Sequence, residues 1–292
     1  MKTTFTTKAA AALALMMVSS ASMAAIQLTK HNLGASRTTS GGLFNAQPNF
    51  TTATTEICIF CHTPHGADTK AQAPLWNRTL STATYQTYSS LGTSTLDSAS
   101  APVGSVSLAC LSCHDGTQAM NVVINSPGSG TAGTVGIGTG TGGAGKFGEF
   151  TAMSEVSGEM IYLATDLRND HPISIQYAGK SSFNPTGNDL DFASAQSTTV
   201  NGQTVWYVEA GTTATINNTV AGTIGGVGMQ KNDLKLYTRG GAADASFNTG
   251  ITGGAQPFVE CASCHDPHVE ATTFLRMGDN NGSKVCLTCH TK

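Results

Sequence analysis

The sequence predicts a fold of mostly irregular backbone, with short helices at four recurring segments and a small β-hairpin region in the middle of the chain. Three observations support this fold class. Glycine is abundant, at 33 residues, which disfavours long helices and strands. Apolar residues make up 39% of the chain, but the long aliphatic runs of an ordinary domain are missing. All eight cysteines occur as closely spaced pairs, so we expect something other than side chains to fill the interior.

Each cysteine pair has the spacing C-x-x-C and is followed at once by a histidine. At this spacing two thiols form thioether bonds to haem vinyl groups, and the histidine ligates the iron. An even number of cysteines in a secreted chain usually indicates a disulfide framework. Disulfides, zinc sites and thioredoxin-like dithiols, however, do not require a histidine directly after the second cysteine. The pattern predicts a haem-dominated multihaem cytochrome c with four covalently bound haem c groups, numbered I to IV in chain order. The attachment residues are Cys58, Cys61 and His62, then Cys110, Cys113 and His114, then Cys261, Cys264 and His265, and finally Cys286, Cys289 and His290.

Four histidines remain outside these motifs, one for each haem. They are His31, His65, His171 and His268. The complete set predicts bis-histidine ligation, which fills both axial positions of every iron and leaves no position open for a substrate. Methionine is the competing axial ligand, since the chain has nine of them.

The second histidine of the C-x-x-C-H-x-P-H segments cannot serve the same haem as the first. Residues three apart on a helical turn lie about 5–6 Å apart on one face, whereas two axial nitrogens approach an iron from opposite sides. We therefore expect His65 to bind haem II and His268 to bind haem IV, which keeps each half of the chain self-contained. His31 and His171 are then left for haems I and III. Ligand histidines three residues apart also force their two porphyrins into contact.

The chain contains an internal repeat, in which a C-x-x-C-H-x-P-H segment is followed by a simple C-x-x-C-H. Duplication of a two-haem unit is the simplest explanation. The expected division is a secretory signal peptide over residues 1–24, an N-terminal dihaem module over 25–125, a Gly/Thr-rich insertion with small β elements and His171 over 126–255, and a C-terminal dihaem module over 256–292.

Local patterns predict a few further elements. A short helix is expected over residues 154–166. Alternating residues over 196–224 predict a hairpin that turns at Ala210 and Gly211, with a third strand over 235–238. Trp76 is expected to pack against a porphyrin face. The carboxylates that adjoin the histidines are expected either to hydrogen-bond a ligand histidine or to face solvent; they are Asp115, Asp170 and Asp266.

Charge and hydropathy exclude several classes of function. The net charge is −3 and only 11% of residues are charged, so we expect neither nucleic-acid binding nor a polybasic membrane patch. The apolar run near the N-terminus, over residues 9–18, is shorter than the about 20 residues that a transmembrane helix needs. We expect a secreted protein without a transmembrane segment, matured in the periplasm and then located at the outer surface or outside the cell.

Several motifs resemble those of the multihaem c-type cytochromes with doubled C-x-x-C-H motifs that metal-reducing bacteria make. These are KHNLG, EICIFCHTPHG, APLWN, CLSCHDGT, DHPIS and CASCHDPH. In filament-forming members the haems stack in an unbroken line through successive subunits, and the resemblance implies that one axial histidine crosses the subunit boundary. His31 lies near the predicted mature N-terminus and haem IV near the C-terminus, so a head-to-tail contact could join them. His31 is thus either the crossing ligand or a ligand to haem I in its own chain.

The function expected from these features is electron transfer along a chain of bis-histidine haems, without enzymatic activity. A head-to-tail homopolymer is the expected assembly, with other redox proteins or extracellular electron acceptors as further partners. The alternatives are a monomeric carrier in the periplasm or on the outer surface, a multihaem reductase with one open iron, and a structural haem-binding surface protein.

Overall fold

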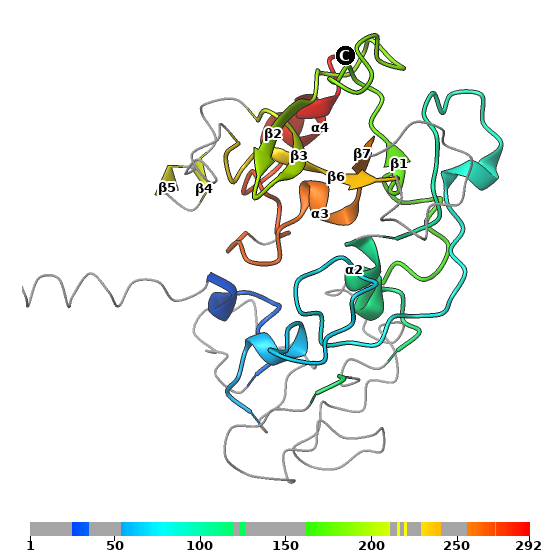
Figure 1. The fold of residues 1–292 in the computed structure, drawn as a ribbon. Coiled ribbons are helices and arrows are strands. Elements are labelled where there is room, and N and C mark those ends of the chain that lie inside the picture. The colour runs from blue at the N-terminus through cyan, green and yellow to red at the C-terminus, as the bar shows by residue number, and fades with distance from the viewer. Residues whose placement is uncertain are drawn as a thin grey trace, which may run out of the picture.

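The structure is a computed structural model that describes residues 25–34, 54–104, 106–118, 123–125, 162–210, 215–216, 219–220, 229–240, 256–271 and 273–292 (Figure 1). The expected signal peptide lies outside the described residues, as does the most glycine-rich part of the insertion, over 126–161. Within the part that is described, no helix is long and apolar enough to cross a membrane.

A five-stranded antiparallel sheet forms the upper part of the molecule in Figure 1. Its strand order is β1-β7-β6-β3-β2. The sheet therefore joins strands of the insertion to β7, which immediately precedes the third haem-attachment motif. A separate two-stranded ribbon pairs β4 with β5. The bounds are Ile175–Gln176 for β1, Gln196–Val200 for β2, Gln203–Val208 for β3, Thr215–Ile216 for β4, Thr219–Val220 for β5, Leu234–Arg239 for β6 and Gln256–Val259 for β7.

The central hairpin turns at Asn201 and Gly202, between β2 and β3. Both residues have positive φ, 50° and 76°, as the tight two-residue turns that match strand twist require, and Asn-Gly is the dipeptide that adopts them most readily. The turn predicted at Ala210 and Gly211 was wrong, because β3 pairs with β2 and β6, whereas β4 pairs with β5. The third strand forms as β6, which includes residues 235–238.

Short helices carry the attachment motifs. They are η2 (Cys58–Phe60), α2 (Ser107–His114), α3 (Cys261–Cys264) and α4 (Lys284–Cys289); η1 (Ala25–Leu28), η3 (Tyr88–Leu91) and η6 (Asn281–Ser283) are further single turns. In three motifs the histidine N–H closes the turn by donating to the carbonyl of the first cysteine, at 2.7 Å for His62, 3.1 Å for His265 and 2.8 Å for His290. Because residues three apart share one face of a helical turn, the two thiols of each pair lie on the same side.

The helix expected over residues 154–166 is not helical in its described part. Residues 162–166 are irregular, and Ala164 has a φ of 56°, which lies in the left-handed region and ends a right-handed helix. The rest of that segment lies outside the described residues.

The main hydrophobic core lies between the sheet and the C-terminal segment. Trp206, Leu234 and Leu236 from the sheet pack with Met277 and with Val285 of α4. Cys264 and Cys289 pack against this same cluster. The last two attachment motifs are therefore held against the sheet.

Candidate haem-attachment and ligand sites

All eight cysteines are described, and each is a free thiol. Among the residues with assigned positions, no group of three or more His, Cys, Asp or Glu side chains is arranged to hold a metal ion. The donor set at each motif is instead two thiols on one face of a helical turn, followed by an imidazole. This set fits haem c, whose vinyl groups take the thiols and whose iron takes the imidazole.

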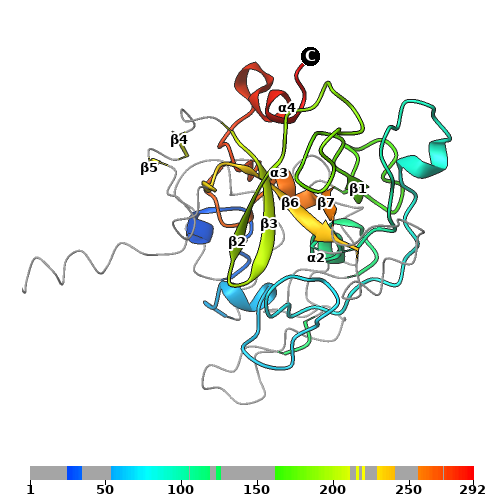
Figure 2. The same cartoon turned by 45° about the horizontal axis from the view of Figure 1, so that its top comes forward.

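The four attachment motifs follow one another in chain order across the molecule. In both Figure 1 and Figure 2, α4, α3, α2 and η2 succeed one another from the top of the view downward. The thiols of successive motifs are neighbours at each of the three junctions between motifs. The motifs thus form a line from I to IV.

The outer two junctions are apolar. Cys61 of motif I and Cys113 of motif II pack against the same buried pair, Leu33 and Phe60. Burial, assisted by the nearby Cys113 thiol, raises the pKa of Cys61 to about 12. Cys264 of motif III and Cys289 of motif IV share the main core, and burial together with the Cys264 thiol raises the pKa of Cys289 to about 12. Such thiols are un-ionised at neutral pH.

The central junction is polar and joins motif II to motif III. The Cys110 and Cys261 thiols hydrogen-bond each other, which raises the pKa of Cys110 and lowers that of Cys261. The backbone N–H of Cys261 donates to Ser107 Oγ at 3.0 Å, and Ser107 in turn donates to Glu260 Oε2 at 2.6 Å. These contacts bind α2 directly to α3.

Glu260 is the centre of a fully buried charge cluster at this junction. Arg239 of β6 donates to its Oε1 at 3.1 Å, and both side chains have an exposed fraction of 0%. Ser174 donates to Oε2 at 3.1 Å. Burial raises the pKa of Glu260 to about 7 against the opposing effect of Arg239. No local sequence pattern indicates this cluster, because its members are far apart along the chain.

The two C-x-x-C-H-x-P-H segments share one backbone arrangement, although the loops that follow them differ in length. Asn77 N donates to Cys61 O and Arg276 N to Cys264 O, both at 2.9 Å. An isolated β-bridge joins His62 to Trp76 in the first segment, and another joins His265 to Leu275 in the second. The internal repeat therefore extends beyond the motif into the returning loop.

In both segments the returning loop fixes the tautomer of the motif histidine. His62 Nδ1 lies 2.6 Å from Pro74 O, and His265 Nδ1 lies 2.8 Å from Thr273 O. A carbonyl oxygen can only accept a hydrogen bond, so Nδ1 carries the proton in each ring and the Nε2 lone pair is left for iron. This is the usual orientation of a ligating histidine held by an outer carbonyl.

The carboxylates predicted beside the histidines differ in their roles. Asp266 Oδ1 accepts from His268, at 3.2 Å from its Nδ1, so this carboxylate orients a candidate ligand. Asp115 is buried and accepts from Tyr85 Oη at 2.6 Å, which makes it neither solvent-facing nor a histidine partner in these contacts. One oxygen of Asp170 is buried without a hydrogen-bond partner in the part of the chain described.

The structure brings three of the four spare histidines next to motif histidines, but not in the pairs expected from the repeat; no such neighbour is described for His65. The ring centres of His62 and His268 are 6.1 Å apart, and those of His31 and His114 are 6.3 Å apart. His171 lies near His290: burial, and to a smaller extent His290, lower the pKa of His171. His268 was expected beside His290, and His31 either beside His62 or in a neighbouring subunit.

Aromatic side chains that the sequence did not single out cover two of these rings. Phe274 stacks on His31 with ring centres 4.2 Å apart, and Phe192 lies 4.4 Å from His290. Trp76 meets the His62 ring edge to face, with ring centres 6.1 Å apart, so it packs beside a candidate axial ligand. Burial, with a smaller effect of His114, lowers the pKa of His31 to about 4 and keeps it neutral, the form that ligates iron.

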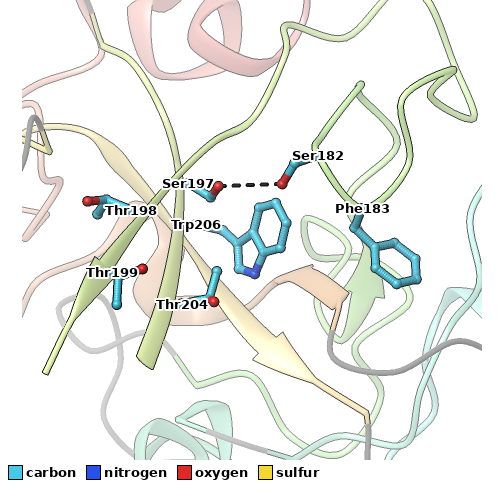
Figure 3. A pocket seen from close by; sticks show the side chains of 7 residues that line it. All are labelled: Ser182, Phe183, Ser197, Thr198, Thr199, Thr204 and Trp206. Carbon is cyan, nitrogen blue, oxygen red and sulfur yellow. Dashed lines mark hydrogen bonds between the residues drawn. The ribbon is translucent and has the colours of Figure 1, made fainter. Parts of the chain in front are cut away.

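A separate pocket of about 360 Å³ opens beside the β2–β3 hairpin (Figure 3). Serine and threonine hydroxyls line it together with Trp206 and Phe183, and none of its lining residues is a histidine, a cysteine or a charged residue. It is distinct from the candidate haem sites. Its remaining lining residues are Ser182, Ser197, Thr198, Thr199 and Thr204.

The doubled motifs support a multihaem c-type cytochrome. A family model described as "Doubled CXXCH motif" matches residues 256–292, which contain motifs III and IV. The match indicates covalently bound haem c and electron transfer by more than one haem. No curated protein matches the chain.

Proposed function

We propose that the chain is a tetrahaem c-type cytochrome, which carries electrons along a line of bis-histidine haems from I to IV. The proximity of the thiols of successive motifs is the observation that carries this proposal. Because each thiol is the attachment point of a porphyrin edge, neighbouring thiols of two motifs bring two porphyrin edges together. The three junctions include Cys61 with Cys113, Cys110 with Cys261, and Cys264 with Cys289.

A haem bound at each motif supplies a one-electron iron centre, and the chain's own residues hold and orient it. The two outer junctions are apolar, and buried surroundings of this kind are one means by which a protein adjusts haem potential. The carbonyls of Pro74 and Thr273 keep His62 and His265 in the ligating tautomer. Eight histidines for four irons leave no axial position for a substrate, so the proposed function is electron transfer without enzymatic catalysis.

A head-to-tail filament is the proposed assembly. Motifs I and IV lie at opposite ends of the line in Figures 1 and 2, so a subunit added at either end would continue it. A contact between two different surfaces that does not close produces an open filament. The chain also resembles OmcE, a tetrahaem extracellular cytochrome that forms nanowires. The proposed location is accordingly the cell surface or the medium, after secretion through the periplasm.

Intact mass and visible spectra of the purified protein test the haem count and the ligation together. The expected result is four covalent haems per chain and a low-spin spectrum that added CO leaves unchanged after reduction. Fewer haems would contradict the tetrahaem proposal, and a haem that binds CO at full occupancy would favour a reductase. Electron micrographs of secreted material decide the assembly: uniform filaments are expected, and only monodisperse single particles would favour the monomeric carrier.

A further inference from the structure

We infer that the axial ligands do not follow the pairs expected from the repeat: His268, from the C-terminal half, is the distal ligand of haem I, and His31 is the distal ligand of haem II. His171 then serves haem IV and His65 serves haem III. This inference rests on the proposed set of four bis-histidine haems and adds the ligand pairs.

The separation of the rings supports the first two pairs. A metal–imidazole bond is about 2 Å long and the ring centre lies about 1 Å beyond the nitrogen, so two imidazoles on opposite sides of one metal have centres about 6 Å apart. The observed separations are 6.1 Å for His62 with His268 and 6.3 Å for His31 with His114. The ring planes meet at 13° in the first pair and 72° in the second, and both angles are allowed because an imidazole can rotate about its bond to the metal.

The hydrogen bonds of the first pair leave the required nitrogens available. Pro74 O accepts from His62 Nδ1, and Asp266 Oδ1 lies 3.2 Å from His268 Nδ1. A carboxylate, like a carbonyl, accepts the hydrogen bond, so both rings carry their proton on Nδ1. In each ring, Nε2 therefore has a free lone pair and is the nitrogen available to bind iron.

The surroundings of the second pair hold His31 within its own chain. Its ring stacks on Phe274, which lies in the loop that returns to motif III. Thr29 Oγ1 accepts from the His31 backbone N–H at 3.2 Å. Asn32 is fully buried, and its Nδ2 donates to Gln27 O at 2.8 Å, which fixes the segment on both sides of the histidine.

The two remaining pairs follow from the repeat and from elimination. His171 is the one spare histidine left for haem IV once the other three are assigned. His65 occupies the same place after motif I as His268 does after motif III, and the loops that follow have the same backbone bridges. If His268 of the C-terminal half binds haem I, the repeat predicts that His65 of the N-terminal half binds haem III in the equivalent way. Haems I and III then exchange ligands.

Variants that lack one haem can distinguish this set of ligand pairs from pairs formed within each half of the chain. The variant Cys58→Ala/Cys61→Ala lacks haem I, and Cys286→Ala/Cys289→Ala lacks haem IV. His268→Ala is added to each, and CO binding by the reduced protein counts five-coordinate haems. We expect one additional CO-binding haem in the background without haem IV and none in the background without haem I. The reverse result would assign His268 to haem IV and overturn the inference, as would one additional haem in both.

His31→Ala tests the second pair in the same material. It should add one CO-binding haem to the background that lacks haem I, because haem II is still present; no addition there would assign His31 to haem I. Added imidazole should restore the low-spin spectrum in each case, which separates a lost ligand from unfolding. The four-haem mass of the parent protein is measured independently, so failure of the tetrahaem proposal is distinguishable from failure of the pairing. For His268, either background alone gives opposite outcomes for the two pairings, so the test survives if the other background does not fold.

Discussion

The two C-x-x-C-H-x-P-H segments have the same local backbone but different support. Residues 75 and 274 occupy equivalent places in the returning loops and both have left-handed φ, 55° for Leu75 and 57° for Phe274. The first segment is held by side chains that bond backbone carbonyls, chiefly those of Asn77 and Arg78. The second is held by the sheet and by the charge cluster of Glu260. The short C-x-x-C-H-x-P-H sequence thus specifies the local backbone conformation, whereas the contacts that hold each segment in the fold come from distant residues.

The largest expected effect concerns the anchorage of the second segment. Arg239→Ala leaves the Glu260 carboxyl buried without its cation, and removing one partner of a buried ion pair costs about 3–5 kcal/mol. Denaturant unfolding should show this loss in the free energy of unfolding. The matched control is Arg168→Ala, which breaks the solvent-accessible pair with Asp166 and should leave the free energy of unfolding nearly unchanged. Equal losses in the two variants would contradict the assigned role of the buried cluster.

The pH dependence of stability should reflect the same carboxyl. Burial raises the folded-state pKa of Glu260 from 4.5 to about 7, so between these values the folded state binds more protons than the unfolded state. Stability from this group is therefore full below about pH 4.5 and falls as pH rises toward 7, by at most about 3 kcal/mol. Unfolding curves at pH 5 and pH 8 measure the difference. Glu260→Gln should reduce this dependence, and an unchanged slope in that variant would contradict the assignment.

A smaller loss is expected at the anchorage of the first segment. Asn77 is fully buried; its Nδ2 donates to Ile59 O at 2.7 Å and to Asn125 O at 2.9 Å, and its Oδ1 accepts from Asn125 N at 2.9 Å. Asn77→Ala leaves these backbone groups unpaired and should lower the free energy of unfolding by about 1–3 kcal/mol. The half-buried Asn184, whose side-chain hydrogen bonds to Asn188 and Thr186 are exposed to solvent, is the control when replaced by alanine and should change stability by less than about 0.5 kcal/mol. A larger loss in the control than at Asn77 would argue against this anchorage.

The smallest expected change in stability concerns the equivalent positions 75 and 274 of the two returning loops. A left-handed conformation costs a non-glycine residue about 1–2 kcal/mol, which glycine avoids. Leu75 is 53% exposed, so Leu75→Gly should leave stability unchanged or raise it by up to about 1 kcal/mol. Phe274→Gly gains the same relief but loses the ring on His31, so it should destabilise the protein and weaken the low-spin signal of one haem. Similar gains in both variants would show that Phe274 does not hold His31.

Much of the candidate site could be predicted because its chemistry is local. The spacing of Cys58, Cys61 and His62 specifies attachment within one helical turn, and counting the remaining histidines yields the ligand set. The pairing could not be predicted, because His268 reaches His62 across about 200 residues of chain and no local pattern records that contact. The hairpin was misplaced for a different reason. The turn was predicted after the alternating segment that starts at Gln203, although Asn201 and Gly202, just before that segment, are a strong turn signal.

The central claim is that the haems of successive motifs adjoin one another, and the structure of the haem-loaded protein tests it most directly. A cryo-electron microscopy map or a crystal structure would place the four irons and their axial ligands. We predict that haem II adjoins both haem I and haem III, and that haem III adjoins haem IV, each iron with two histidines. A map in which haem II does not adjoin haem III, or in which one iron lacks a second histidine, would contradict the account.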